Sequence, residues 1–294
     1  METWRERLKA QGVLITDGAW GTQLSQKGLK AGEAPELWNA DRPEDVFSVA
    51  SSYVEAGSDI ILTNTFGGSK VKLSKSGLAE RTRELNEKGV RLSRQAAGET
   101  VLVFASVGPC GEFMEPLGSL PRQTAVDSFA EQIEACMSAG ADAVVAETFT
   151  DLEEAKAVLE AARSVGTFPL IVSMTYDRGR TSFATIMGIQ PKQAARELED
   201  AGADGVGVNC GMGIDGAVHV VKLLRQATSL PIWAKPNAGL PELVNGVTVF
   251  KETPEEMASK VPALLDAGAS HIGGCCGTTP AHLRAFVQAA KERA

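Results

Sequence analysis

One short motif recurs at four places along this chain, and it constrains the fold more than any other feature. Each copy reads Ala-Gly, then a small residue, then Asp or Ser, at residues 56–59, 139–142, 201–204 and 267–270. Each copy ends a helix-like stretch and begins a short apolar run. Glycine fits the left-handed conformation that closes a helix, and the residues after it turn into a strand. The motif therefore predicts a helix-to-strand joint that is used four times.

The apolar runs that follow these joints alternate with four other runs, which makes eight in all. We expect strands at residues 13–16, 60–66, 101–106, 143–149, 170–176, 205–210, 232–235 and 271–276. Amphipathic stretches such as 151–162 and 191–201 lie between them, as crossover helices do between parallel strands. Capping hydroxyls are expected at Thr150, Thr253 and Thr279. We predict an α/β fold, a single (β/α)₈ TIM barrel, with residues 1–294 as one domain.

The loops that follow the strands are longer than the joints that precede them. Residues 19–43 and 239–253 are two such long segments. In barrels of this kind the carboxyl ends of the strands carry the active site. Within the second segment, Asn245-Gly246 lies between apolar residues and predicts a small hairpin over that face.

Three of the five cysteines lie in glycine-flanked segments at the ends of two expected strands. Cys210 ends the sixth strand, and Cys275 and Cys276 end the eighth, so all three should share one rim of the barrel. Glycines at 273, 274 and 277 ease the backbone twist that an adjacent pair of ligands needs. Three thiolates hold Zn²⁺ while leaving one tetrahedral position open, as in catalytic zinc sites. We predict a zinc enzyme that acts on a thiol.

Polar residues at the ends of other strands are candidates for the same rim. Asp17, after the first strand, is a carboxylate that could hold an amine. Glu147 ends an apolar strand, where a substrate ammonium is a natural partner, and the alternative is a structural hydrogen-bond anchor. Asn237 ends the seventh strand, between the two cysteine-bearing strands, where its amide oxygen could reach a zinc ion. Otherwise it is a turn asparagine.

The other cysteines and the histidines are expected to be structural or are left without a role. Cys136 lies in a helical stretch and is expected in the core, whereas Cys110 follows the third strand with no partner pattern, so its role stays open. His271 begins its strand at the end opposite the cysteines, and His219 and His282 lie in helical stretches. No histidine is therefore expected at the metal.

Composition excludes several classes of partner. Lys and Arg number 29 against 37 Asp and Glu, so the net charge of −8 repels nucleic acid and anionic membranes. The sequence has neither a signal-peptide pattern nor an apolar run of about 18 residues. Five cysteines, an odd and sparse set, fit reduced thiols better than disulfides. We expect a cytoplasmic protein with a small-molecule substrate and no nucleic-acid or membrane partner.

The chain resembles the homocysteine S-methyltransferase family, the zinc-dependent barrel that also forms the N-terminal module of cobalamin-dependent methionine synthase. Matching segments run over nearly the full length, at residues 17–19, 63–66, 106–109, 147–149, 209–211, 236–239 and 273–280. The last of them, Gly-Gly-Cys-Cys-Gly-Thr-Thr-Pro, is the most specific.

This resemblance implies the roles of particular residues. Zinc would be bound by Cys210, Cys275 and Cys276, with Asn237 as a resting fourth ligand that the substrate thiol displaces. The amino-acid end of homocysteine would lie near Asp17, Gly18, Ala19 and Glu147, and Asn209 is a further candidate for substrate binding. Coordination to zinc deprotonates a thiol, and the ionised sulfur would attack a methyl group to give methionine.

The methyl donor has two alternatives. Gly277 within the cysteine motif is similar to the cobalamin-dependent synthases, and the sequence holds no corrinoid-binding domain, so we expect methylcobalamin to arrive on a separate corrinoid protein. A small onium donor such as S-methylmethionine is the other alternative. Segment 175–183 departs from the serine-rich pattern of the synthase modules, which leaves a thiol other than homocysteine open. A third hypothesis is a non-catalytic zinc-bearing subunit that docks a corrinoid protein.

Overall fold

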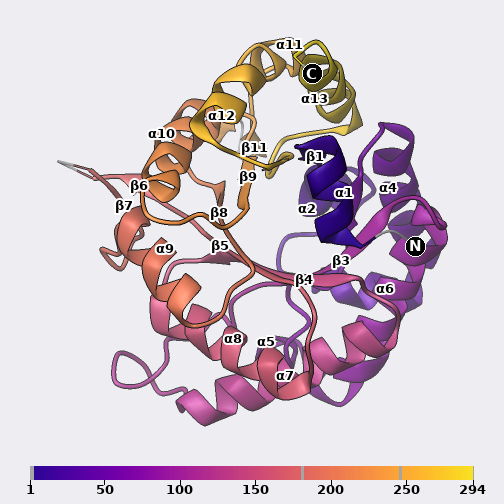
Figure 1. Ribbon diagram of the computed structural model, residues 1–294. Helices are drawn as coiled ribbons and strands as arrows, with labels where there is room; N and C mark the ends of the chain where they lie inside the picture. The colour runs from indigo at the N-terminus through magenta and orange to yellow at the C-terminus, as the bar shows by residue number, and fades with distance from the viewer. Residues whose placement is uncertain (1–2, 180–181, 245–246, 294) are drawn as a thin grey trace.

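The computed structural model describes residues 3–179, 182–244 and 247–293, and it has the predicted barrel architecture. Eight parallel strands form an inner ring, and helices surround it (Figure 1). The strands, in spatial order, are β1 (Leu14–Ile15), β12 (His271–Ile272), β9 (Ile232–Pro236), β8 (Gly205–Cys210), β5 (Leu170–Met174), β4 (Ala143–Phe149), β3 (Leu102–Val107) and β2 (Ile60–Leu62).

The helices pack their apolar faces against this sheet. Most of them are the crossover helices, namely α4 (Pro43–Glu55), α6 (Thr82–Ala97), α7 (Arg122–Ser138), α8 (Leu152–Val165), α9 (Pro191–Asp200), α10 (Gly213–Arg225), α12 (Val261–Ala267) and α13 (Pro280–Lys291). Shorter helices lie in the long loops or before the first strand, namely α1 (Trp4–Gln11), α2 (Trp20–Gln26), η1 (Pro35–Leu37), α3 (Trp38–Asp41), α5 (Lys70–Ser74), η2 (Ala79–Arg81) and α11 (Pro254–Ala258). No helix in the described ranges is long and apolar enough to cross a membrane.

The repeated motif is explained by a shared hydrogen-bonding arrangement. Its glycines have φ values between +94° and +103°, in the left-handed region predicted from the sequence. The residue that ends each motif donates its backbone N–H to one residue of the preceding barrel strand and accepts that residue's N–H with its side chain, at 2.7–3.0 Å. These pairs are Asp59 with Ile15, Asp142 with Val103, Asp204 with Leu170 and Ser270 with Ile232. The motif therefore joins the barrel strands two by two.

The barrel closes between β1 and β2 through side chains. Asp59 bonds with both backbone groups of Ile15 on β1. In the opposite direction, Asp17, which follows β1, accepts the backbone N–H of Leu62 on β2 with its carboxylate at 2.8 Å. Since an unpaired buried N–H is costly, these carboxylates satisfy the strand edges at the point where the sheet meets itself.

The amino end of the barrel is filled by an aromatic cluster. Trp4 on α1 donates its indole N–H to His271 Nε2 at 2.7 Å, and the rings of Phe104 and Trp233 stack with centroids 6.2 Å apart. Burial lowers the pKa of His271 to about 3, so the ring is neutral at physiological pH. His271 is thus structural, as the sequence analysis expects.

Several predicted boundaries are wrong. Strand β2 ends at Leu62 and β12 at Ile272, so residues 63–66 and 273–276 lie in loops. The cap of α8 is Asp151 rather than Thr150. The strands that flank the predicted hairpin, β10 (Glu242–Val244) and β11 (Val247–Val249), pair antiparallel, whereas residues 245–246 lie outside the described residues. A second hairpin, β6 (Asp177–Arg178) with β7 (Phe183–Ala184), was not predicted.

Candidate active site

The three cysteines predicted to bind zinc come together at the carboxyl end of the barrel. Cys210 Sγ lies 2.8 Å from Cys275 Sγ, which lies 4.0 Å from Cys276 Sγ. All three sulfurs are within 4.8 Å of one another, and none is in a disulfide. Zinc–sulfur bonds of about 2.3 Å require sulfur pairs about 3.8 Å apart. The Cys275–Cys276 pair has nearly this spacing, whereas Cys210 and Cys275 would have to separate by about 1 Å to bind one zinc ion.

Unusual backbone conformations bring the sulfurs together. Cys210 ends β8 with φ +58°, a left-handed value that is rare outside glycine. Cys275 and Cys276 lie three and four residues beyond β12, not at its end as predicted. Their loop is fixed to the neighbouring strand, because the Cys275 N–H donates to Pro236 O at 2.8 Å and the Cys276 carbonyl accepts from Ala238 N at 2.9 Å.

Asn237 has the properties expected of a fourth ligand. Its Nδ2 donates to the Gly211 carbonyl at 3.1 Å, which fixes the orientation of the amide. Its Oδ1 is buried and has no hydrogen-bond partner in the described part of the chain. Buried polar atoms are normally satisfied, so this unpaired oxygen is a candidate for the predicted fourth zinc ligand.

The three clustered thiols shift one another's pKa values. The neighbouring Cys210 and Cys275 thiols lower the pKa of Cys276 to about 3 by hydrogen bonding to its sulfur. Hydrogen bonds from Cys275 and Cys276 raise the pKa of Cys210 well above its usual value. The cluster therefore resists ionisation of all three thiols together, and a divalent cation would favour it.

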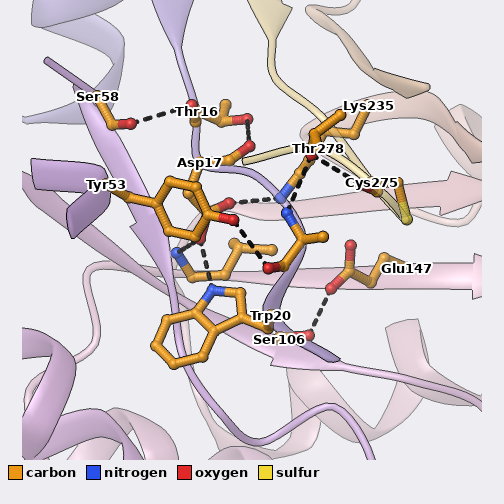
Figure 2. Close-up of polar contacts among 12 residues, drawn as sticks. Thr16, Asp17, Trp20, Tyr53, Ser58, Ser106, Glu147, Lys235, Cys275 and Thr278 are labelled. Atoms are coloured by element: carbon orange, nitrogen blue, oxygen red, sulfur yellow. Dashed lines mark hydrogen bonds and ion pairs between the residues drawn. The ribbon is translucent and has the colours of Figure 1, made fainter. Parts of the chain in front are cut away.

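Asp17 does not present a free carboxylate in this structure, and its predicted contact with the substrate stays a prediction. It is fully buried, and its Oδ2 accepts from the Trp20 indole N–H at 2.7 Å and from Leu62 N at 2.8 Å. Its Oδ1 accepts from Lys235 Nζ at 2.5 Å (Figure 2). The amine that Asp17 holds is therefore the one on Lys235.

Lys235 is the residue that the sequence analysis missed. Its side chain is only 3% exposed, and it lies on β9 next to the cysteine loop. The sequence contains a clue to its role, because Lys235 interrupts the otherwise apolar run 232–236, and a lysine is almost never buried unless its charge is paired.

Glu147 is a buried carboxylate at the wall of the site. Ser106 donates its hydroxyl to Glu147 Oε1 at 2.5 Å (Figure 2). Burial raises the pKa of Glu147 to about 7, although the nearby Lys235 charge opposes this shift. A cation in the site would compensate the desolvated carboxylate, as predicted for a substrate ammonium.

Asn209 holds the backbone beside the site, and its predicted contact with the substrate stays a prediction. It is fully buried, and its Oδ1 accepts from the Thr148 N–H at 2.9 Å and from the Ser173 hydroxyl at 2.7 Å. Its Nδ2 donates to Thr148 Oγ1 at 2.7 Å. Thr148 has φ +68°, an outlier for a β-branched residue, and it follows Glu147 at an irregularity in the register of β4. Asn209 therefore holds the strained backbone that directs Glu147.

A cavity of about 600 Å³ joins these groups to the surface. Its inner wall contains Gly18, Ala19, Glu147, Thr148, Lys235 and the three cysteines. Its outer wall includes Glu33, Glu36, Phe66, Lys72 and Lys75. The cavity therefore has room for an acceptor beside the sulfurs and for a second small molecule toward the mouth.

The other cysteines lie outside this cavity. Cys110 is buried, and burial raises its pKa to about 12, while its backbone N–H donates to Glu154 Oε1 at 2.7 Å. Cys136 is buried on α7, and burial raises its pKa to about 12 as well. His282 accepts from the backbone N–H of Thr279 at the start of α13, and His219 Nδ1 lies 2.8 Å from the Asp215 carbonyl.

The fold and the site together define a barrel enzyme with an open three-cysteine centre beside a pocket of mixed charge. A family model described as homocysteine S-methyltransferase matches residues 14–290, and the chain belongs to this family. It is therefore a methyltransferase, and the hypothesis of a non-catalytic subunit is not retained.

Individual relatives agree with this assignment. The chain is 32% identical to methionine synthase of Mycobacterium tuberculosis and 31% identical to that of Mycobacterium leprae, over 94% of its own length and 24% of theirs. It thus spans about a quarter of the length of these relatives. Among solved structures, it is similar to the metallated and oxidised forms of the homocysteine methyltransferase MmuM from Escherichia coli. In both the TM-score is 0.79 over 99% of each chain, with 25% and 26% identity.

Replacing Glu147 with glutamine is expected to stabilise the ligand-free protein at pH 8. Because the folded-state pKa of about 7 lies above the ordinary value of 4.5, the folded state binds more protons in this window, and stability falls as pH rises through it. This loss of unfolding free energy is complete above pH 7 and amounts to about 1–3 kcal/mol. Urea unfolding should therefore show Glu147→Gln to be more stable than the wild type at pH 8 but not at pH 4.

A second buried carboxylate provides the matched control for this variant. The pKa of Glu154 is also raised to about 7 by burial, but this residue lies away from the cavity. Glu154→Gln should gain similar stability and keep its affinity for an amino-acid thiol, whereas Glu147→Gln should lose about 10- to 100-fold in that affinity. Equal affinities in the two variants would contradict the role given to Glu147.

Replacing Asn209 with alanine is expected to weaken both the fold and the site. The Thr148 N–H and the Ser173 hydroxyl would lose their buried acceptor, at a cost of about 2–4 kcal/mol in unfolding free energy. KM for the thiol should rise more than kcat falls, because Glu147 is misdirected while the cysteines persist. Ser173→Ala, which removes only one partner of the amide, should change stability alone; an unaltered KM in Asn209→Ala would refute the positioning role.

Proposed function

We propose that this protein transfers a methyl group to the sulfur of L-homocysteine, at a zinc ion held by Cys210, Cys275 and Cys276. The observation that carries the proposal is the placement of three clustered sulfurs and a buried carboxylate, Glu147, on one wall of one cavity. When bound, zinc would supply the positive charge that keeps the acceptor thiol ionised at neutral pH.

The residues of the chain position the acceptor for attack. Glu147 receives the ammonium group, and the amide oxygen of Asn237 would be the zinc ligand that the acceptor thiol replaces. The acceptor sulfur then attacks the methyl carbon in line, a carbon–sulfur bond forms, and the bond to the donor breaks with its electron pair leaving on the donor. No proton transfer is needed in this step, which agrees with the lack of a histidine on the cavity wall among the described residues.

Segment 175–183 gives no structural reason to replace homocysteine with another thiol. Residues 175–183 raise the question of a different acceptor, because they differ from the pattern of the synthase modules. In the described part of this segment no residue lines the cavity, and Asp177–Arg178 and Phe183–Ala184 form the hairpin β6–β7 instead. The described part of this departure therefore lies outside the acceptor site.

As donor we propose methylcobalamin carried by a separate corrinoid protein. The similarity to methionine synthases, at 31–32% identity, supports this choice. Gly277 supports it less than the sequence suggests, because its φ of +82° and the closeness of Phe250, 2.3 Å from where a Cβ would lie, account for glycine locally.

A small onium donor such as S-methylmethionine is a second candidate, which the outer cavity favours. Phe66, with 40% of its surface exposed, lies there with Glu33, while Lys72 and Lys75 line the same part of the cavity. Aromatic faces and carboxylates attract organic cations. The cavity of about 600 Å³ also leaves space for a donor of that size above the acceptor.

Replacing Cys276 with serine is expected to abolish zinc binding and turnover while leaving the barrel folded. The metal would lose one of three sulfur ligands, so turnover should fall by more than about 100-fold. Zinc content after dialysis, circular dichroism and product formation measure the three effects. Cys136→Ala, which removes a thiol from the core, should keep one zinc per chain; retention of zinc and turnover by Cys276→Ser would refute the proposed centre.

Supplying the two donors in parallel will identify the methyl source. Zinc-loaded protein with L-homocysteine should form methionine from methylcobalamin and not from S-methylmethionine, because the corrinoid donor is the one proposed. Methionine from S-methylmethionine alone would overturn the corrinoid proposal and establish the second candidate. Chromatography of the products measures both reactions, and heat-denatured protein controls for uncatalysed transfer.

A further inference from the structure

Lys235 is a buried cation with unused hydrogen-bonding capacity. An ammonium group has three N–H donors. One of them is taken by Asp17 Oδ1 at 2.5 Å, and in the described part of the chain Nζ makes no second hydrogen bond. The ring of Trp233 lies 5.8 Å from Nζ, which gives the charge an aromatic contact but no acceptor.

The ion pair is not simply a structural one. Lys235 lines the cavity together with Glu147 and the three cysteines, whereas Asp17 does not. Asp17 is held by Trp20, by the backbone of Leu62 and by the ion pair itself, so it acts as a fixed counter-charge behind the lysine. Figure 2 shows Lys235, Glu147 and Cys275 around the same space.

The cavity wall therefore carries two opposite charges beside the sulfurs. Glu147 provides a carboxylate, bonded only to the Ser106 hydroxyl among the described residues, and Lys235 provides an ammonium. An α-amino acid carries an ammonium group and a carboxylate, so each of its charges can pair with the opposite charge on this wall. The neighbouring turn offers less to a carboxylate, because the Ala19 N–H is already donated to Thr278 Oγ1 at 3.1 Å.

We propose that Lys235 binds the α-carboxylate of the acceptor, so that the site selects amino-acid thiols over simple aminothiols. This inference rests on the proposed function, since it names the residue that recognises one end of homocysteine. Glu147 binds the ammonium group, Lys235 binds the carboxylate, and the side-chain sulfur reaches the cysteine cluster. Lys235 is then the specificity-determining residue of the acceptor site.

The test compares two thiols that differ only in the carboxylate. L-homocysteine and 3-aminopropane-1-thiol have the same chain, amine and sulfur, and their dissociation constants are measured by titrating the cobalt-substituted protein and following its thiolate absorption. Lys235→Met should weaken L-homocysteine binding by about 10- to 100-fold and leave 3-aminopropane-1-thiol within about threefold of the wild type. An equal loss for both thiols, or no loss for L-homocysteine, would overturn the inference.

A second variant removes the risk that an unpaired Asp17 unfolds the protein. The double variant Asp17→Asn with Lys235→Met takes out both charges and keeps an acceptor for the Leu62 N–H. It should show the same selective loss of L-homocysteine binding; a loss shared by the two thiols would again contradict the inference. Failure of the wild type to bind L-homocysteine, with 3-aminopropane-1-thiol bound normally, would instead overturn the proposed acceptor and the inference with it.

Discussion

Both the barrel and the site depend on the hydrogen bonds and the ion pair that the carboxylate of Asp17 makes. Its Oδ2 bonds to Leu62 N across the seam between β1 and β2 and to the indole of Trp20, which begins α2. Its Oδ1 holds Lys235 from β9. Burying two charges is costly, and removing one partner of such a pair costs more than the pair contributes. One side chain thus closes the sheet and fixes a cation inside it.

A second buried polar residue, Asn209, stabilises strained backbone conformations in the site. Thr148 and Cys210 both have positive φ values, and each such residue costs about 1–3 kcal/mol. The side chain of Asn209 bonds to Thr148 at two atoms and adjoins Cys210 in the chain. Because the same amide links β4 to β8, the carboxylate on one strand and the sulfur on the other keep a fixed separation.

The sequence allows the barrel to be predicted, because its signals are local. The left-handed glycine and the capping Asp or Ser of each motif act within a few residues, and the cysteines stand out by type and by glycine neighbours. Lys235 and Asn209 were harder to interpret, since their partners, Asp17 and Thr148, are distant in the sequence. The sequence predicts strands where the loops after β2 and β12 lie, because their apolar and small residues continue the run, whereas the backbone leaves the sheet at Leu62 and Ile272.

The pairing of Lys235 with Asp17 also bears on reactivity. An isolated ammonium beside Cys275 would attract negative charge and make the sulfurs poorer nucleophiles. Paired with a carboxylate on its far side, the same ammonium forms a dipole, and the field of a dipole falls off faster with distance than that of a charge. A carboxylate in direct contact with Nζ still gains a hydrogen bond, whereas Cys275, which makes no hydrogen bond to Nζ among the described residues, feels a weaker field. The buried ion pair therefore lets the cavity hold an anionic group close to an electron-rich sulfur without neutralising it.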